Sequence, residues 1–284
     1  MSPIVTLIVP VYNQVGLLER ALRTLETTED RRFVVHIVDD GSTDPVQTLC
    51  TALQQQKAIT YPLMFTRFDH TGNSTVMVNE AAYVADTRYI AYMNSDLEFP
   101  DPKWLGATLD CFDRFSGVDP TGNQVQGMPV VYKRVAIVGI KQLFPAKNPL
   151  APGCVAHNGN FYQADGSWKH LEEFVPAAQS RFNTSGLVEG VTGAGMFVQR
   201  EFWKDVGGFP VFWPYGWDDV GMCLQAHQLQ ALVVCQREHP ILHVRSASYG
   251  RPKHPLYERN SRWIYLRWGH TIDRLVRSRQ PLPA

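Results

Sequence analysis

Short uncharged apolar runs alternate with helix-type segments through the first third of this chain. The central run, residues 89–93, reads Tyr-Ile-Ala-Tyr-Met and predicts a strand that is buried on both faces. Such strands belong to parallel sheets that helices cover on both sides. Earlier runs of the same kind lie at residues 4–9, 33–38 and 63–66, with apolar residues at helical spacing between them. Strands and helices that alternate in units of roughly 30 residues predict an α/β fold with a mostly parallel sheet and right-handed crossovers.

The turn after the first predicted strand lacks the common nucleotide-binding loops. A dinucleotide-binding domain carries Gly-x-Gly-x-x-Gly at this point, so that the backbone can approach a pyrophosphate. Here residues 10–14 read Pro-Val-Tyr-Asn-Gln, and the first glycine is Gly16. A Walker loop is absent as well. The sequence therefore disfavours a nicotinamide- or flavin-binding Rossmann domain.

Carboxylates follow two of the predicted strands. Asp39 and Asp40 come directly after the strand at 33–38, and Asp96 follows the central strand. The carboxyl ends of parallel strands are where open α/β sheets bind their ligands. Taken alone, an Asp after a strand is more often a turn former or a helix cap. Two like-charged turns that lie close together are costly, however, unless a divalent cation or the hydrogen-bond donors of a ligand lie between them.

A third acidic site lies at the end of an aromatic stretch. Asp218 and Asp219 follow residues 209–217, which are rich in Phe, Trp and Tyr. Aromatic walls suit a sugar ring or another flat apolar face, and low-dielectric surroundings raise the pKa of a carboxylate toward the strength of a useful base. The alternative is an Asp helix cap beneath core aromatics. His243, near the end of a later predicted strand, is by itself more often a structural hydrogen-bonding group than a metal ligand.

Bulk composition limits the class of protein and its partners. Lys plus Arg and Asp plus Glu both total 27, so no overall field favours nucleic acid, and we expect no nucleic-acid partner. The five cysteines are odd in number and contain no Cys-x-x-Cys pair, which disfavours a disulfide framework or a zinc site. No signal peptide follows Met1, and no apolar run approaches the roughly 18 residues that span a bilayer. We therefore expect a cytoplasmic protein.

The ordered set of motifs resembles the family 2 glycosyltransferases of the GT-A fold. The matching segments are residues 9–13 (Val-Pro-Val-Tyr-Asn), 38–44 (Val-Asp-Asp-Gly-Ser-Thr-Asp), 94–96 (Asn-Ser-Asp), 191–196 (Val-Thr-Gly-Ala-Gly-Met), 207–209 (Gly-Gly-Phe), 216–220 (Gly-Trp-Asp-Asp-Val) and 258–260 (Glu-Arg-Asn). They follow the order of the family and cover about residues 3–266. The resemblance implies a Rossmann-like, mostly parallel sheet flanked by helices, and an enzyme that uses a nucleotide-sugar donor.

The resemblance also implies a role for each matching position. The expected nucleotide-binding residues are Pro10, Tyr12, Asn13, Asp39, Asp40, Asn94 and Ser95, with the Tyr12 ring stacked on the base. Asp96 and His243 are the expected ligands of a Mn²⁺ or Mg²⁺ ion. Asp219 is expected to be the general base and Asp218 to bind or orient the acceptor. The expected donor and acceptor pocket is formed by Thr192, Gly193, Ala194 and Trp217. Asn94 departs from the family motif, in which the first position is Asp.

The implied reaction is a single displacement that inverts the anomeric carbon. The metal ion neutralises charge on the departing nucleoside diphosphate, and a carboxylate takes the proton from the acceptor hydroxyl. UDP- and dTDP-sugars are the expected donors, with GDP-sugars left open. The expected acceptor is a glycan, a lipid-linked sugar or another glycoconjugate in polysaccharide biosynthesis. The alternatives are a catalytically inactive carbohydrate-binding relative and a nucleotidyltransferase, which needs a basic Gly-rich loop that residues 10–14 lack.

The end of the chain carries an excess of positive charge. Residues 245–284 contain nine Lys or Arg against two acids, and aromatic and aliphatic residues interleave with them. This pattern is typical of a helix that lies on a membrane surface; the alternatives are a helix docked on the catalytic domain and an oligomer contact. We predict a catalytic domain over residues 1–244, a basic helical extension over residues 245–284 and a peripheral contact with the inner membrane face. Arg251 or Lys253 is a candidate for closing over the diphosphate.

Overall fold

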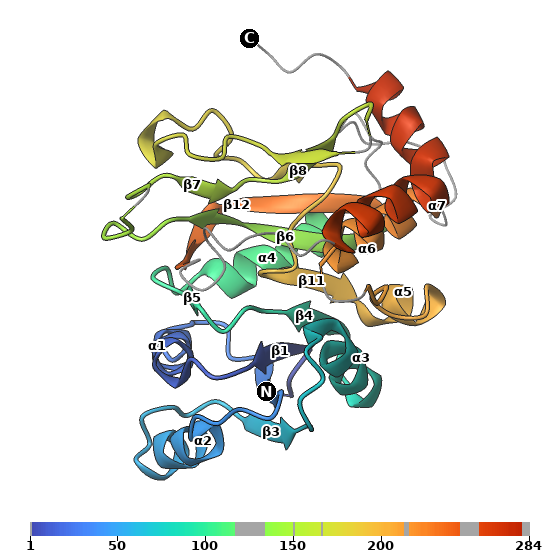
Figure 1. The fold of residues 1–284 in the computed structure, drawn as a ribbon. Coiled ribbons are helices and arrows are strands. Elements are labelled where there is room, and N and C mark those ends of the chain that lie inside the picture. The colour runs from blue at the N-terminus through green and yellow to red at the C-terminus, as the bar shows by residue number, and fades with distance from the viewer. Residues whose placement is uncertain are drawn as a thin grey trace.

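A ten-stranded sheet forms the centre of the computed structural model, which describes residues 2–116, 134–149, 151–165, 167–212, 216–244 and 256–279 (Figure 1). The main path of the sheet runs through β3 (Leu63–Arg67), β2 (Phe33–Asp39), β1 (Val5–Val11), β4 (Tyr89–Tyr92), β11 (Met196–Gln199), β6 (Val135–Leu143), β12 (Leu232–His243) and β10 (Gly186–Leu187). Off this path, β5 (Leu97–Glu98) pairs with β12, and β7 (Val155–His157) pairs with β6. A separate hairpin consists of β8 (Asn160–Tyr162) and β9 (Trp168–His170).

Most strands on the main path point the same way. β3, β2, β1 and β4 pair in parallel, with Val5 of β1 opposite both Phe33 of β2 and Tyr89 of β4. β11 runs antiparallel to β4 and to β6, and β12 pairs with β6 in parallel, so β6 and β12 share the direction of the first four strands. All four residues of β4 are buried, as a strand covered on both faces requires. The predicted mostly parallel α/β sheet is confirmed.

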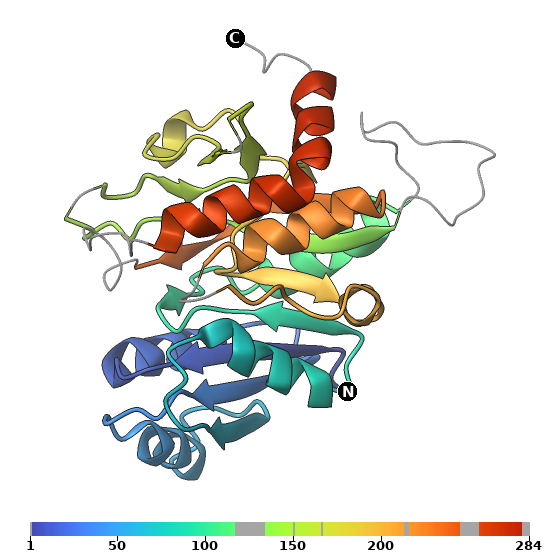
Figure 2. The same cartoon turned by 45° about the vertical axis from the view of Figure 1, so that its right-hand side comes forward.

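Helices cover both faces of the sheet (Figures 1 and 2). α1 (Val15–Leu25), α2 (Val46–Gln55) and α4 (Trp104–Arg114) pack on one face, where they meet Val5 and Leu7 of β1. α3 (Ser74–Val84), α5 (Arg200–Asp205) and α6 (Asp218–Gln228) pack on the other face, against Ile8 of β1 and Ile90 of β4. Successive residues of a strand therefore face opposite helical layers, which explains why the strand sequences are apolar without interruption.

The segment before β11, residues 188–195, lies close to the sheet. Its small residues are expected to let a backbone or a ligand come close; β11 begins at Met196, and Gly195 before it has a φ of 89°. The close approach is to Gly139 of β6, where a side chain would collide with Val191. The residues between Val191 and β11 therefore turn above the sheet rather than extending along it.

The strand pattern near the end of the sheet is also simpler than expected. Residues 232–235 and 241–244 are expected to form two strands, but both lie in the single strand β12. Its pairing with β6 is irregular between Gln236 and Ile241, which is where the apolar pattern is interrupted. Pairing with β6 therefore overrides the local sequence signal.

The predicted cap of α2 is wrong. Ser42 or Asp44 is expected to cap this helix with Pro45 in its first position, but Pro45 is the N-cap residue and has no polar side-chain group. The Ser42 hydroxyl instead accepts from the backbone N–H of Asn13 at 2.7 Å, and Asp44 Oδ2 accepts from that of Val15 at 3.1 Å. Because Val15 is the first residue of α1, Asp44 stabilises the start of α1 rather than α2.

The C-terminal extension contains a long helix, α7 (Leu256–Ser278), which packs beside α6 (Figure 2). Ile264, Trp268 and Ile272 of α7 lie in one buried cluster with Val220 and Leu224 of α6. The predicted helical extension is confirmed, and one of its faces is docked on the sheet-forming part of the chain. No helix within the described ranges is both long and apolar enough to cross a membrane.

Candidate active site

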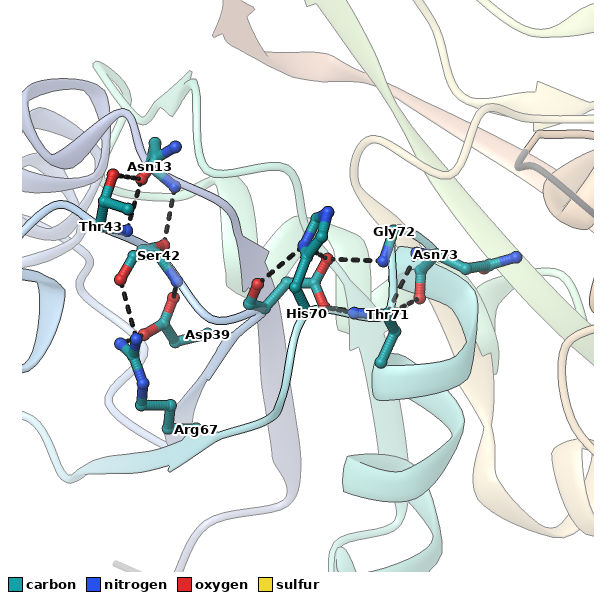
Figure 3. A network of polar contacts seen from close by, with 10 residues as sticks. Asn13, Asp39, Ser42, Thr43, Arg67, His70, Thr71, Gly72 and Asn73 are labelled. Atoms are coloured by element: carbon teal, nitrogen blue, oxygen red, sulfur yellow. Dashed lines mark hydrogen bonds and ion pairs between the residues drawn. The ribbon is translucent and has the colours of Figure 1, made fainter.

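Asp39 ends β2, and its buried carboxylate fixes the turn that follows. Its Oδ2 accepts from Arg67 Nη1 at 2.5 Å, and its Oδ1 accepts from the Ser42 N–H at 3.0 Å. Arg67 Nη2 also donates to the Ser42 carbonyl at 2.9 Å. Figure 3 shows the Asp39 and Arg67 side chains together with the Ser42 backbone at the ends of β2 and β3. The guanidinium therefore compensates a buried negative charge that would be costly alone.

Asp40 holds the turn that leads into α3. Its Oδ1 accepts from the Thr71 N–H at 2.6 Å and its Oδ2 from the Gly72 N–H at 3.0 Å, while His70 Nδ1 lies 3.0 Å from Oδ2. The His70 ring stacks on Tyr12, with the ring centroids 4.3 Å apart. Tyr12 is 47% exposed, so an accessible aromatic ring lies next to the acidic turn.

The turn between β1 and α1 uses two left-handed residues where dinucleotide-binding domains use glycines. Asn13 and Gln14 have φ values of 60° and 61°, a conformation that Asn tolerates better than most residues. The Asn13 carboxamide oxygen accepts from the Thr43 N–H at 2.8 Å (Figure 3). It also accepts from the Asp44 N–H at 3.2 Å. Pro10 lies in β1 beyond its last pairing with β4, so its missing N–H costs no hydrogen bond to that strand.

Asp96 and His243 meet where β5 pairs with β12. His243 lies opposite Leu97 in this pairing. Its Nε2 is 3.3 Å from Asp96 Oδ1, and both side chains are about nine-tenths buried. Asn94 Nδ2 lies 3.5 Å from the same nitrogen, and Ser95 separates Asn94 from Asp96 in the turn. The two predicted metal ligands are therefore adjacent, although they are far apart in the sequence.

Gln142 of β6 sets the orientation of His243. Its Nε2 donates to the Ala194 carbonyl, and its Oε1 lies 2.8 Å from His243 Nδ1. Because an amide oxygen only accepts, Nδ1 carries a proton, and in the neutral ring the lone pair of Nε2 faces Asp96. A lone pair and a carboxylate that face each other fit a cation between them, with one nitrogen and one oxygen ligand.

The Asp96–His243 pair supplies only part of a metal coordination shell. Across the described residues there is no group of three or more His, Cys, Asp or Glu side chains that could hold a metal ion. Mg²⁺ commonly takes one or two protein ligands and completes its shell with substrate phosphates and water. The two side chains therefore suit an ion that arrives with a diphosphate better than a permanently bound one.

Asp218 and Asp219 begin α6, after Trp217 with a left-handed φ of 72°. Asp219 Oδ2 accepts from the Gly193 N–H at 2.9 Å and Oδ1 from the Val220 N–H at 2.8 Å. Burial raises the pKa of the Asp219 carboxyl, although these donors act in the opposite direction. Burial, followed by the negative charge of Asp219, raises the pKa of Asp218 to about 7. The pair therefore retains a proton at higher pH than ordinary carboxyl groups do.

The turn at residues 192–194 connects the Asp96–His243 pair to the Asp218–Asp219 pair. The Gly193 N–H donates to Asp219, while the Ala194 carbonyl accepts from Gln142, the partner of His243. A side-chain carbon on Gly193 would lie 3.6 Å from both Asp219 and the Tyr92 ring. The predicted pocket residues of this turn therefore lie directly against the acid pair.

The start of α3 connects this region to the Asp40 turn. Ser74 Oγ is 2.7 Å from the hydroxyl of Tyr92, and Thr75 hydrogen-bonds to Asp218. Both residues follow closely after Thr71 and Gly72, whose N–H groups bind Asp40. The three acidic sites expected from the sequence are therefore linked by short chains of hydrogen bonds and packing contacts.

Three polar residues of this region were missed by the sequence reasoning. They are Arg67, His70 and Gln142. Each is an isolated polar residue whose partner comes from another strand or turn, so no local motif marks it. The structure also contains an open cavity of about 1130 Å³ that Trp217 lines, whereas Asp40, Asp96 and Asp219 do not.

Solved glycosyltransferases share this fold. The mannosyltransferase PcManGT from Pyrobaculum calidifontis, solved with GDP-Man and Mn²⁺, matches with a TM-score of 0.58 at 17% identity, over 100% of this chain and 67% of its own. GalNAc-T7, solved with UDP, GalNAc and Mn²⁺, has a TM-score of 0.67 at 12% identity, over 98% of this chain and 52% of its own. S. aureus TarS, solved with UDP-GlcNAc, has a TM-score of 0.62 at 14% identity, over 97% of this chain and 70% of its own. The fold is the GT-A fold of these glycosyltransferases.

Sequence comparison leads to the same class of enzyme. The chain is 27% identical over 255 residues to the O-antigen biosynthesis protein RfbC of Myxococcus xanthus. The match takes in 87% of this chain, which spans only 18% of the length of that relative. The family model described as glycosyl transferase family 2 matches residues 6–168, more than half of the chain. This chain therefore belongs to glycosyltransferase family 2.

Proposed function

We propose that this glycosyltransferase inverts the anomeric configuration as it moves a sugar from a nucleoside diphosphate donor to an acceptor hydroxyl. The observation that carries the proposal is the turn at residues 192–194. It contacts the Asp96–His243 pair through Gln142 on one side and Asp219 on the other. A diphosphate leaving near the first pair and a hydroxyl attacking near Asp219 would flank the transferred sugar, and this arrangement supports a single displacement.

Asp219 is the proposed general base. Two backbone N–H groups, from Gly193 and Val220, fix the orientation of its carboxylate. Its raised pKa brings its proton affinity closer to that of a base that works near neutral pH. Asp218 is proposed to orient the acceptor hydroxyl by a hydrogen bond, since it keeps its proton to higher pH than an exposed carboxyl does.

Asp96 and His243 are the proposed ligands of a Mn²⁺ or Mg²⁺ ion. When bound, such an ion would supply Lewis-acid neutralisation of the charge on the diphosphate. Gln142 would act as the outer hydrogen-bond partner that holds the imidazole in place. PcManGT and GalNAc-T7 were solved with Mn²⁺, which supports a divalent ion here. Asn94 and Ser95 are proposed to contact the nucleotide beside this ion.

The turns after β1 and β2 are proposed to bind the nucleotide base, through Pro10, Tyr12, Asn13, Asp39 and Asp40. The half-exposed ring of Tyr12 offers a face on which a base can stack. UDP- and dTDP-sugars are the proposed donors. Because PcManGT was solved with GDP-Man and TarS with UDP-GlcNAc, GDP-sugars belong in the same test.

The acceptor is proposed to be a glycan or glycoconjugate in polysaccharide biosynthesis. Similarity to an O-antigen biosynthesis protein supports this choice. Thr192, Gly193, Ala194 and Trp217 are the proposed lining of the donor and acceptor pocket. Trp217 supports the assignment because it lies next to the acid pair and also lines the open cavity.

The extension, residues 245–284, is proposed to attach the catalytic domain, residues 1–244, to the cytoplasmic face of a membrane. α7 buries one side on α6, while Trp263 and Leu266 are 45% and 83% exposed. The exposed arginines of the same helix are Arg259, Arg262, Arg267, Arg274 and Arg277. Exposed aromatic, leucine and arginine side chains on one helix fit an anionic lipid surface. Arg251 and Lys253, expected to close over the diphosphate, lie outside the described residues.

The proposed chemistry is tested by nucleotide release from UDP-, dTDP- and GDP-sugars, with and without Mn²⁺. We expect one donor to release its nucleotide slowly to water and to require the metal. Asp219→Asn is expected to reduce release by about 10²–10⁴-fold while donor affinity is retained. Asp96→Ala is expected to weaken donor affinity when metal is present. Normal turnover by Asp219→Asn would refute the base assignment, and donor binding without release by the unsubstituted protein would indicate an inactive relative.

A further inference from the structure

The open cavity beside Trp217 forms a groove whose described lining contains none of the residues proposed to bind the nucleotide or the metal ion. Its walls come from β8, β9, the segment at 171–181, Trp217 and the first part of α7. Trp217 directly precedes Asp218 and Asp219 in the chain, so one lining residue of the groove is covalently joined to the acid pair. Of the site residues expected from the sequence, Trp217 is the one that lines it.

We propose that this groove binds a neutral oligosaccharide, the acceptor chain, whose terminal hydroxyl reaches Asp219. The inference rests on the proposed function, and it adds the chemical class of the acceptor and the surface that holds it. Four features of the groove support it: the aromatic wall, the balance of charge, the volume and a connection to the base.

Three rings line one wall of the groove. Trp168 packs edge-to-face on Trp217, with centroids 6.3 Å apart, and on His170 at 4.9 Å. An indole combines a large flat apolar face with a single N–H donor. A sugar ring presents the matching surface, a face of C–H groups with hydroxyls at its rim. Trp168 is half-buried, so part of its ring is accessible to a ligand.

The charges that line the groove balance. Its basic residues are Lys169, Arg181 and Arg262, and its acidic residues are Glu172, Glu173 and Glu258. Arg181 and Glu172 lie 3.9 Å apart and partly neutralise each other. Recognition of phosphate or carboxylate groups relies on Arg and Lys, and here each positive charge is matched by a negative one. Hydrogen-bond donors and acceptors in equal numbers suit hydroxyl groups, because a hydroxyl both donates and accepts hydrogen bonds.

The volume of the groove exceeds that of one small-molecule site. Pockets for small organic ligands measure about 300–1,000 Å³, whereas this groove measures about 1130 Å³. It is also spread over several elements rather than closed around one point. The groove therefore suits a chain of sugars better than a single ring.

A histidine pair joins the groove to the proposed base. His170 Nδ1 lies 2.8 Å from His157 Nδ1, and His157 Nε2 accepts from the Thr192 N–H at 3.4 Å. Gly193, the next residue, donates to Asp219. A ligand that contacts His170 therefore acts on the same turn that orients the base.

The test measures oligosaccharide binding by the whole chain and by variants at Trp168. The probes are neutral gluco-, manno- and galacto-oligosaccharides of one to six units, titrated by calorimetry. Trp168→Ala removes the ring, and Trp168→Tyr retains a smaller one. Tyr83→Ala is the matched control, because Tyr83 is an aromatic residue of α3 that is 77% exposed and does not line the groove.

We expect at least one longer oligosaccharide to bind about tenfold or more tightly than its monosaccharide. Trp168→Ala should abolish this gain, Trp168→Tyr should keep part of it, and Tyr83→Ala should leave it unchanged. Equal affinity of Trp168→Ala and the unsubstituted protein overturns the assignment. The assignment is also overturned if no neutral oligosaccharide binds. This holds even if an anionic polysaccharide or a lipid diphosphate sugar binds instead.

Nucleotide release by the unsubstituted protein, measured alongside, tests the proposed function separately. Release without oligosaccharide binding would refute the groove alone. Oligosaccharide binding without release from any sugar nucleotide would refute the transfer chemistry alone.

Discussion

The Asp218 side chain makes the stability of the protein depend on pH in a predictable direction. Its pKa of about 7 in the folded state compares with a value of about 4 for an unperturbed Asp. The folded chain therefore holds a proton that the unfolded chain releases, and stability falls as the pH rises through this window. Asp218→Asn removes the ionisation. We expect the variant to unfold at a higher temperature than the unsubstituted protein at pH 8, with a smaller difference at pH 4; equal differences at both values would contradict the assignment.

Gln142 would affect the proposed metal ion through His243 rather than by direct contact. Gln142→Leu removes both the acceptor for His243 Nδ1 and the donor to the Ala194 carbonyl. The loss of such an outer partner typically costs about 10–100-fold in metal affinity. We therefore expect the Mn²⁺ concentration for half-maximal nucleotide release to rise by this factor. Gln55→Leu, at the exposed end of α2, is the control that should not change it; an unchanged metal requirement in Gln142→Leu would refute the positioning role.

The acids of the site could be predicted from the sequence, but several of their partners could not. Asp39, Asp40 and Asp96 follow apolar strands within short motifs, so their positions at the sheet edge follow from local sequence. Arg67 reaches Asp39 only because β2 and β3 pair in the register that places them opposite each other. Gln142 meets His243 only because β6 and β12 are neighbours. Residue roles that depend on strand register leave no local signal.

The exposed face of α7 is expected to contact an anionic membrane surface, and this contact can be tested. We expect the protein to bind vesicles that contain phosphatidylglycerol, and to bind less at high salt, because arginines on an exposed helix are attracted to anionic lipid. Leu266→Glu, which places a charge at an 83% exposed apolar position, should weaken binding severalfold. Lys57→Gln, at an exposed residue after α2, lowers the net charge by the same one unit and should have little effect. Equal loss in both variants would indicate a general charge effect instead of a contact through α7.

Helices were easier to predict than strand limits. The Gly72–Asn73 turn predicts a helix after it, and residues 104–115 are expected to be helical; α3 and α4 lie there because each has its own buried face. β12 is longer than either of the two apolar runs that it contains. The ends of a strand depend on its neighbours in the sheet, and β11 and β12 both pair with β6, which comes from a distant part of the chain.

The donor can be identified from the stability of the whole molecule. A ligand that binds only the folded state stabilises it by an amount that grows with the logarithm of its concentration, about 2.7 kcal/mol at 100 times Kd. We expect a UDP- or dTDP-sugar with Mn²⁺ to raise the unfolding temperature, and the same sugar without metal to raise it less. Mannose or galactose without a nucleotide serves as the control. A larger shift with GDP-mannose than with any UDP- or dTDP-sugar would contradict the proposed donor class.

The close approach of Val191 to Gly139 has a consequence for how the catalytic centre can vary. Val191 occupies the space that a side chain at position 139 would need, and the turn that carries Gly193 and Ala194 follows immediately. Any bulkier residue at position 139 of β6 would displace this turn as a unit. Departure of the nucleotide and removal of the acceptor's proton would then be disturbed together. A substitution at this point would therefore alter both proposed steps and could not tune one of them alone.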